Sequence, residues 1–147
     1  TTEIYTLSLH DALPILEKAD DYKEMRIRNH QLYKKYLSDV PGILFQSEPD
    51  KDCIDVCWMN TIVIDPAKYG HHKDELIAHL KENEIDTRLL FTGMHKQKAM
   101  MDYGCDCSGE YPVCEWLTEN GFYLPSSSSL TEEQIKFICG IISNFAK

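Results

Sequence analysis

Helix-like and strand-like segments alternate along this chain, and that alternation restricts its fold more than any single motif. In the helix-like segments apolar residues recur every three or four positions, which places them on one face. The strand-like segments are short runs rich in β-branched residues. Helices are expected over residues 16–39, 73–83, 110–119 and from Thr131 onward, and strands over 56–65, 85–91 and 122–124. This order predicts a two-layer α/β (α+β) domain with helices packed on a small sheet.

The ends of several segments carry signals of their own. Pro41-Gly42 ends the first helix, and Gly121 is expected to cap the helix over 110–119. Thr131 and Gln134 have the spacing of a capping box at the start of the last helix. The face that the first helix is expected to bury carries Tyr22, Met25, Asn29, Leu32, Tyr33, Tyr36 and Leu37.

Composition excludes some classes of function. The chain has 147 residues, of which 43% are hydrophobic, and this is enough for one domain with a real core. Its net charge of -9 argues against a nucleic-acid binder, which needs a basic face to neutralise phosphates. No apolar run is long enough to span a bilayer, and no basic segment marks an export signal, so a cytoplasmic protein without a membrane partner is expected.

The six cysteines are expected to be free thiols. Cys53 and Cys57 are spaced differently from the C-x-x-C pairs that hold zinc, and so are Cys105 and Cys107. A zinc site built from these four residues, in a small non-enzymatic binding domain, stays open as an alternative.

Residues 1–15, TTEIYTLSLHDALPI, resemble one reading frame of a short-read sequencing adapter. We therefore expect this stretch to lie outside the native domain. That domain is expected to cover residues 16–147 and to begin with the helix over 16–39.

The segment from Arg88 to Lys98, RLLFTGMHKQK, is the densest in chemically useful side chains. Its Arg and Lys residues can donate charge-assisted hydrogen bonds to phosphate or carboxylate groups. His95 and Gln97 can bond to sugar hydroxyls, and Phe91 can pack against a base or a sugar. A solvated basic loop is the alternative. Motifs of nucleophilic catalysis, of a Walker phosphate loop and of a dinucleotide fold are absent from the sequence.

Three segments resemble the DegT/DnrJ/EryC1/StrS aminotransferase family. Residues 16–37, LEKADDYKEMRIRNHQLYKKYL, are similar to the helix that leaves the large domain in this family. IDTRLLFTGMHKQ, residues 85–97, is similar to its TR-x-x-F-x-x-mH-x-Q stretch, and GFYLPSSSSLTEEQI, residues 121–135, to its LPs…LteeqI ending. The three matches follow the order and spacing of the family and cover nearly all of residues 16–147.

The resemblance implies the small C-terminal domain of a fold type I enzyme that uses pyridoxal phosphate. Such enzymes move an amino group from glutamate to a nucleotide-linked keto sugar, work as homodimers and serve surface polysaccharide biosynthesis; perosamine synthase-like members look most similar. The lysine that forms the Schiff base belongs to the large domain, which precedes the position of Leu16. Hence no catalytic, cofactor-binding or metal-binding residue is assigned here, and this fragment is expected to be inactive and to bind no cofactor alone. The expected substrate-binding residues are Arg88, Phe91, His95, Lys96 and Gln97.

A second hypothesis keeps this fold but assigns a different reaction. The TRLLF motif also resembles that of sugar 3-dehydratases, which use the amine form of the cofactor with an iron–sulfur centre. The cysteines of this chain, however, lack the close grouping of iron–sulfur cluster ligands. In either case a fragment should expose apolar surface and tend to associate. Tyr33, Tyr36 and Trp116 are candidates for that surface, with core positions as the alternative.

Overall fold

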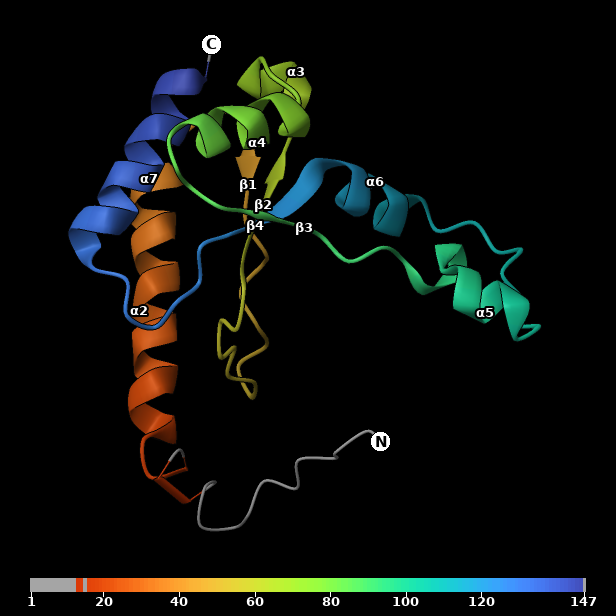
Figure 1. Cartoon of the computed structure of the whole chain (residues 1–147), viewed down its shortest axis with the longest axis horizontal. Coiled ribbons are helices and arrows are strands. Elements are labelled where there is room, and N and C mark those ends of the chain that lie inside the picture. Colours follow the sequence, from red (N-terminus) through yellow and green to blue (C-terminus); the bar gives the residue numbers. More distant parts are fainter. Residues whose placement is uncertain (1–12, 15, 147) are drawn as a thin grey trace, which may run out of the picture.

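The computed structural model describes residues 13, 14 and 16–146 of the chain (Figure 1). Most of the adapter-like stretch lies outside these residues, so its interpretation stays a prediction. The helices are α2 (Ala19–Leu37), α3 (Pro66–Tyr69), α4 (Lys73–Glu82), α5 (Lys98–Asp102), α6 (Pro112–Asn120) and α7 (Glu132–Phe145), with a 3-10 turn η1 (Met94–Lys96). The strands are β1 (Ile43–Leu44), β2 (Asn60–Ile64), β3 (Arg88–Leu89) and β4 (Gly121–Leu124).

The four strands form one antiparallel sheet in the order β1-β2-β4-β3. In the centre Ile62 lies opposite Phe122, and at the edge Arg88 lies opposite Tyr123. Because successive side chains of a strand point to opposite faces, Phe122 and Ile62 share one face while Tyr123 and Arg88 share the other.

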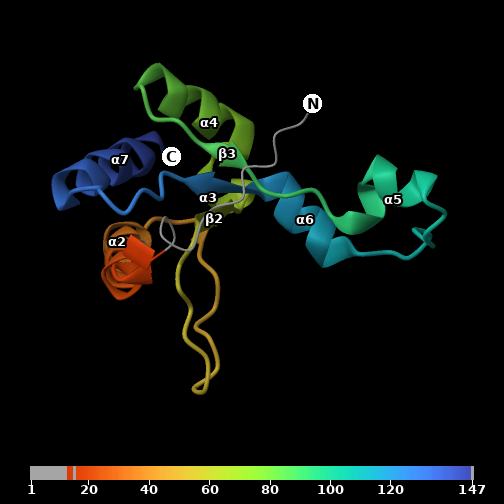
Figure 2. The same ribbon diagram turned by 60° about the horizontal axis from the view of Figure 1, so that its bottom comes forward.

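The core lies between one face of this sheet and the helices α2, α4 and α7, as Figure 2 shows most clearly. Its fully buried members are Tyr33, Leu37, Ile62, Ile64, Tyr69, Leu76, Leu80, Phe122, Ile135 and Ile142. The predicted class, with helices packed on a small sheet, is confirmed. The described helices include none that is long and apolar enough to cross a membrane.

Helix α6 contacts β2 and β4, buries its last residue, Asn120, and runs directly into β4. Gly121, the residue at this junction, has extended backbone (φ -102°) and not the left-handed conformation expected of a glycine cap. A side chain at Gly121 would bring its Cβ within 2.7 Å of the Leu117 carbonyl oxygen. Glycine therefore allows the last turn of α6 to approach the sheet closely.

Both longer strand predictions were too long. β2 begins only at Asn60, because Cys57 has a φ of +49° and turns the chain out of the sheet. β3 contains only Arg88 and Leu89. Ile85, the expected first residue of that strand, instead donates its N–H to the Leu80 carbonyl at the end of α4, at 2.9 Å. The sequence analysis did not predict β1, α3, η1 or α5, which are too short to show a periodic pattern.

The predicted buried face of α2 is correct only for the C-terminal half of the helix. Asn29, Tyr33 and Leu37 are buried, whereas Tyr22 and Met25 remain 40% and 39% exposed. Tyr33 is thus a core residue and does not belong to an exposed association surface. In α7 the predicted capping box is confirmed, since the Thr131 hydroxyl accepts the Gln134 N–H and the Gln134 side chain accepts the Thr131 N–H.

The segment 125–130, which we call the serine loop, joins β4 to α7 and is held by side chains of α2. Asn29 donates from Nδ2 to the Ser127 carbonyl at 2.8 Å, and the Tyr33 hydroxyl donates to the Pro125 carbonyl at 3.0 Å. From the other side the Asn60 N–H donates to the Ser126 hydroxyl at 2.9 Å. These bonds fix the position of the loop relative to both α2 and β2.

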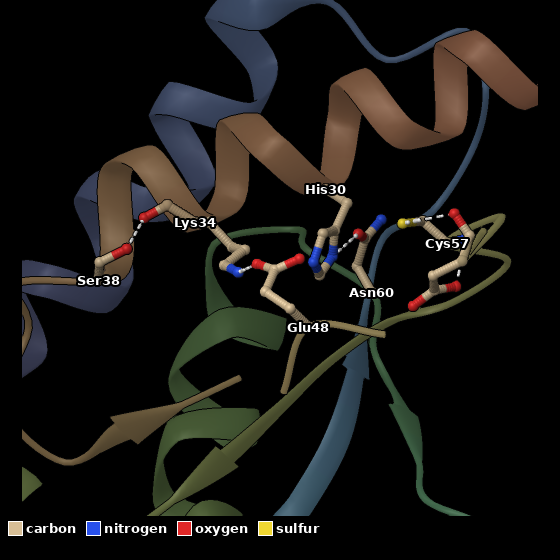
Figure 3. A network of polar contacts seen from close by, with 7 residues as sticks. His30, Lys34, Ser38, Glu48, Cys57 and Asn60 are labelled. Atoms are coloured by element: carbon tan, nitrogen blue, oxygen red, sulfur yellow. Dashed lines mark hydrogen bonds and ion pairs between the residues drawn. The ribbon is translucent and has the colours of Figure 1, made fainter. Parts of the chain in front are cut away.

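Residues 45–59 leave β1, extend away from the body of the domain and return to β2; we call them the excursion. Figure 3 shows how α2 holds its two ends. Lys34 pairs with Glu48, and the His30 ring lies 3.3 Å from the Asn60 side-chain oxygen. Hydrogen bonding to Lys34 keeps the pKa of Glu48 below its ordinary value, so this pair is charged at neutral pH.

We expect Asn29→Ala to lower the free energy of unfolding by about 1–3 kcal/mol, because it removes a fully buried side chain together with its hydrogen bond to the Ser127 carbonyl. Urea unfolding measures this change. Tyr36→Phe is the matched control, since it removes one α2–α7 hydrogen bond, from Tyr36 to Glu132, outside the serine loop. Equal small effects of the two substitutions would contradict the role given to Asn29.

Candidate functional site

A groove of about 1010 Å³ runs along the end of the sheet, between β3 and the N-terminal half of α7. One wall is formed by the segment that leads into β3, including Glu84 and Asp86. The opposite wall combines α2, the excursion and the serine loop. Apolar side chains that line the groove include Trp58, Ile85, Leu89, Tyr123, Leu130 and Phe137. An apolar hollow with a few polar groups around it is the usual form of a small-molecule site.

Two of the five expected substrate residues, Arg88 and Phe91, line this groove. Arg88 lies on the edge strand β3, opposite Tyr123 of β4. The Phe91 ring is 67% exposed and meets the Tyr123 ring edge-on, with 5.7 Å between the ring centroids. The groove therefore presents a guanidinium group beside two aromatic rings.

His95 and Lys96 do not line the groove. Both bind Glu115 of α6: His95 Nε2 and Lys96 Nζ each lie 3.2 Å from the same carboxylate oxygen. The His95 ring also packs on Tyr111, with 4.6 Å between the centroids. Hydrogen bonds from Lys96 and then from His95 hold the pKa of Glu115 below its ordinary value. The two basic residues thus fix the segment after β3 to α6.

Gln97 is also used within the chain, since its Nε2 donates to the Thr92 carbonyl at 3.3 Å. Between the two sets of residues lies a second, apolar hollow of about 480 Å³, lined by Phe91, Tyr111, Leu117 and others. Phe91 borders both hollows. The single basic segment of the sequence is therefore divided in space, with Arg88 and Phe91 at the groove and His95, Lys96 and Gln97 beside α6.

The sequence analysis missed two groove residues, Arg26 and Trp58. Arg26 is not on the face that its helix is expected to bury, and Trp58 falls within the strand expected over 56–65. In the structure Arg26 donates from Nη1 to the Trp58 carbonyl at 2.8 Å, across 32 positions of sequence. Helical periodicity cannot reveal such a pairing, because it depends on the path of the excursion.

The residues that line the groove do not fit covalent attachment of pyridoxal phosphate, which requires a lysine amine to form an imine. The groove lining contains no lysine within the described part of the chain. Lys96 and Lys98, the nearest in sequence, pair with Glu115 and Asp102. The zinc alternative also lacks support, because no group of three or more His, Cys, Asp or Glu side chains in residues 13, 14 and 16–146 is placed to hold a metal ion.

The sequence of this chain is similar to a known protein family and to curated proteins. The model of the DegT/DnrJ/EryC1/StrS aminotransferase family matches residues 12–143. A GDP-perosamine synthase from Escherichia coli O157:H7 is 31% identical over 130 residues, which cover 88% of this chain and 33% of that protein. The chain spans about a third of the length of the curated relatives that it matches.

Solved structures show the same fold. A DegT DnrJ EryC1 StrS aminotransferase from Brucella abortus has a TM-score of 0.75 at 25% identity, over 91% of this chain and 34% of that one. A GDP-4-keto-6-deoxy-D-mannose-3-dehydratase from E. coli, with bound hydrated PLP, also has a TM-score of 0.75, at 16% identity over 88% and 33% of the two chains. The fold of this chain is therefore found both in an aminotransferase and in a dehydratase of known structure.

The ion pairs of Glu115 predict a pH dependence of stability. Because its pKa in the folded chain lies below the ordinary value of 4.5, its contribution is fully present above about pH 4.5 and is lost as the pH falls through the lower, folded-state pKa. The difference in unfolding free energy between the wild type and Glu115→Gln should therefore be constant above about pH 4.5 and shrink as the pH falls below it. Glu119→Gln, on the same helix but outside these ion pairs, is the matched control. A difference for Glu115→Gln that stays constant at all pH values would refute the assignment.

Proposed function

Because the chain belongs to the DegT/DnrJ/EryC1/StrS aminotransferase family, we propose that it is the C-terminal small domain of a sugar-nucleotide aminotransferase. The family depends on pyridoxal phosphate. In the proposed reaction an amino group moves from glutamate to a nucleotide-linked 4-keto-6-deoxy sugar, and the product serves surface polysaccharide biosynthesis. The sequence similarity to GDP-perosamine synthases favours a guanosine nucleotide as the carrier.

The observation that carries this proposal is the placement of Arg88 and Phe91 on one groove. Both residues belong to the stretch that resembles the family's substrate-bordering motif. A guanidinium group binds phosphate oxygens through paired, charge-assisted hydrogen bonds, and an aromatic ring can cover the apolar face of a sugar or a base. A nucleotide-linked sugar offers both kinds of surface.

His95, Lys96 and Gln97 support the site indirectly in this proposal. Their bonds to Glu115 and to the Thr92 carbonyl hold the segment that follows β3, which sets the position of Phe91. Glu115 thereby becomes a positioning residue that the sequence analysis did not identify. These three residues contact substrate only if their present partners are exchanged.

The chain supplies one side of the proposed reaction site. Pyridoxal phosphate, when bound, would act as the electron sink for the carbon that carries the transferred amino group, and it needs a lysine that the groove does not contain. We propose that a large domain supplies this lysine, that the whole enzyme is a cytoplasmic homodimer, and that this chain is inactive alone.

A sugar 3-dehydratase is the second candidate, because the fold is equally similar to a dehydratase of known structure. That likeness has 16% identity and concerns the fold alone. The GDP-perosamine synthase match has 31% identity over nearly the same length. The aminotransferase reaction is therefore the better supported of the two.

The groove should bind guanosine diphosphate, and Arg88→Ala should weaken that binding by about tenfold to a hundredfold through loss of charge-assisted hydrogen bonds. Isothermal titration calorimetry of the chain measures this. Lys98→Ala is the matched control, because Lys98 pairs with Asp102 and does not line the groove. Equal affinities of the two variants would exclude Arg88 from the site.

Mixing the chain with pyridoxal phosphate should leave the absorbance spectrum of the free cofactor unchanged. The reason is that the lysines of the 88–98 segment pair with carboxylates and none lines the groove. An absorbance band of an internal imine that survives dialysis and disappears on reduction would show that this chain carries its own cofactor lysine.

A further inference from the structure

The backbone is strained at two points, one in a wall of the groove and the other directly before a wall residue. Among the described residues, Cys57 (φ +49°) and Glu84 (φ +61°) are the non-glycine residues with positive φ. Glu84 lines one wall, and Cys57 directly precedes Trp58 and Met59 of the opposite wall. Residues are held in this sparsely populated region only where the surrounding structure fixes them, and such positions cluster at ligand sites.

The contacts around Cys57 fix this strained conformation. The Asp55 carboxylate accepts the Cys57 N–H at 2.8 Å, and the Cys57 thiol donates to the Asp55 carbonyl at 3.6 Å. The turn ends the apolar run of β2 early and takes the next residue out of the sheet. Its effect is therefore to set the direction of Trp58.

Trp58 is 58% exposed, although it is among the largest apolar side chains available to the core. It lines the groove, and Arg26 of α2 fixes its carbonyl with the 2.8 Å hydrogen bond. Arg26 is itself partly buried and also lines the groove. The strained turn at Cys57 and the hydrogen bond from Arg26 thus keep the Trp58 ring at the groove. The ring is therefore not buried in the core.

We propose that Trp58 and Arg26 form the subsite for the base end of the nucleotide, with the Trp58 ring stacked on the purine. This inference rests on the proposed function, because it assigns the nucleotide to the same groove as Arg88. Stacking on an exposed aromatic ring suits any base and needs only an accessible face. The Arg26 guanidinium retains donors beyond the one bound to Trp58 and can reach phosphate or base oxygens.

The acidic residues of the groove lie away from the wall that carries Trp58. The acidic lining residues Glu84, Asp86 and Glu133 come from the segment before β3 and from α7. The wall of α2, the excursion and the serine loop contributes Arg26, Trp58, Ser126 and Ser127, with no acid. A nucleotide therefore meets no acidic side chain on the Trp58 wall.

The two tryptophans of the chain allow a direct test. In a Trp116→Phe background, Trp58 is the remaining source of indole fluorescence. Guanosine diphosphate should quench this emission in a saturable way. Trp58→Leu should weaken guanosine diphosphate binding by about tenfold, and Trp58→Tyr should restore most of the affinity because it keeps an aromatic face.

Inorganic pyrophosphate serves as the matched probe without a base. Its affinity should be the same in Trp58→Leu and in the wild type, which separates loss of stacking from loss of folding. If guanosine diphosphate binds Trp58→Leu as tightly as the wild type while Arg88→Ala loses it, the subsite is wrong and the proposed function stands. If the wild type does not bind guanosine diphosphate, both proposals fail.

A protein partner on Trp58 is the competing occupant. In that case the emission of Trp58 should shift with protein concentration in the absence of nucleotide, in parallel with self-association measured by sedimentation. That result, combined with no quenching by guanosine diphosphate, would overturn the nucleotide subsite.

Discussion

The attachment of the serine loop to α2 is the interaction on which the rest of this structure depends. Asn29 is a polar side chain with no exposure, and burying such a group is tolerated only when its hydrogen bonds are made. Its amide donates to the Ser127 carbonyl, and its oxygen accepts from the Arg28 guanidinium. Because the serine loop leads directly into α7, these bonds also determine where α7 starts relative to the sheet. A purely apolar contact would hold the same elements together with less control over their register.

The groove is a consequence of that arrangement. Its walls come from segments far apart in sequence, and each is placed by a specific contact: Arg26 with the Trp58 carbonyl, Asn60 with the Ser126 hydroxyl, and Ile85 with the end of α4. Arg88 lies on the edge strand β3 and Phe91 follows shortly after it, and both side chains are exposed. The chain therefore presents a groove without a lysine, and in the proposed enzyme the reactive amine would come from another part of the protein.

Much of the fold was predictable from local patterns, and much of the site was not. The order of the main elements and the capping box of α7 follow from periodicity and from residue types that act within a few positions of each other. The lengths of β2 and β3 were overestimated, because a β-branched run does not reveal that Cys57 turns out of the sheet or that Ile85 bonds to α4. Arg88 and Phe91 could be selected from the basic segment. Arg26, Trp58 and Glu115 depend on contacts between distant segments, so no pattern in the sequence marked them.

The shortness of the outer strands restricts how copies of this chain can meet. β1 and β3, the two edges of the sheet, contain two residues each. They leave few unpaired backbone amides and carbonyls along which a neighbouring strand could be added. Contacts between molecules must then be made by side chains on the faces of the domain, where shape and composition decide the partner. Extended fibres of paired strands are disfavoured, because the edge strands offer few backbone groups for a further strand to bind.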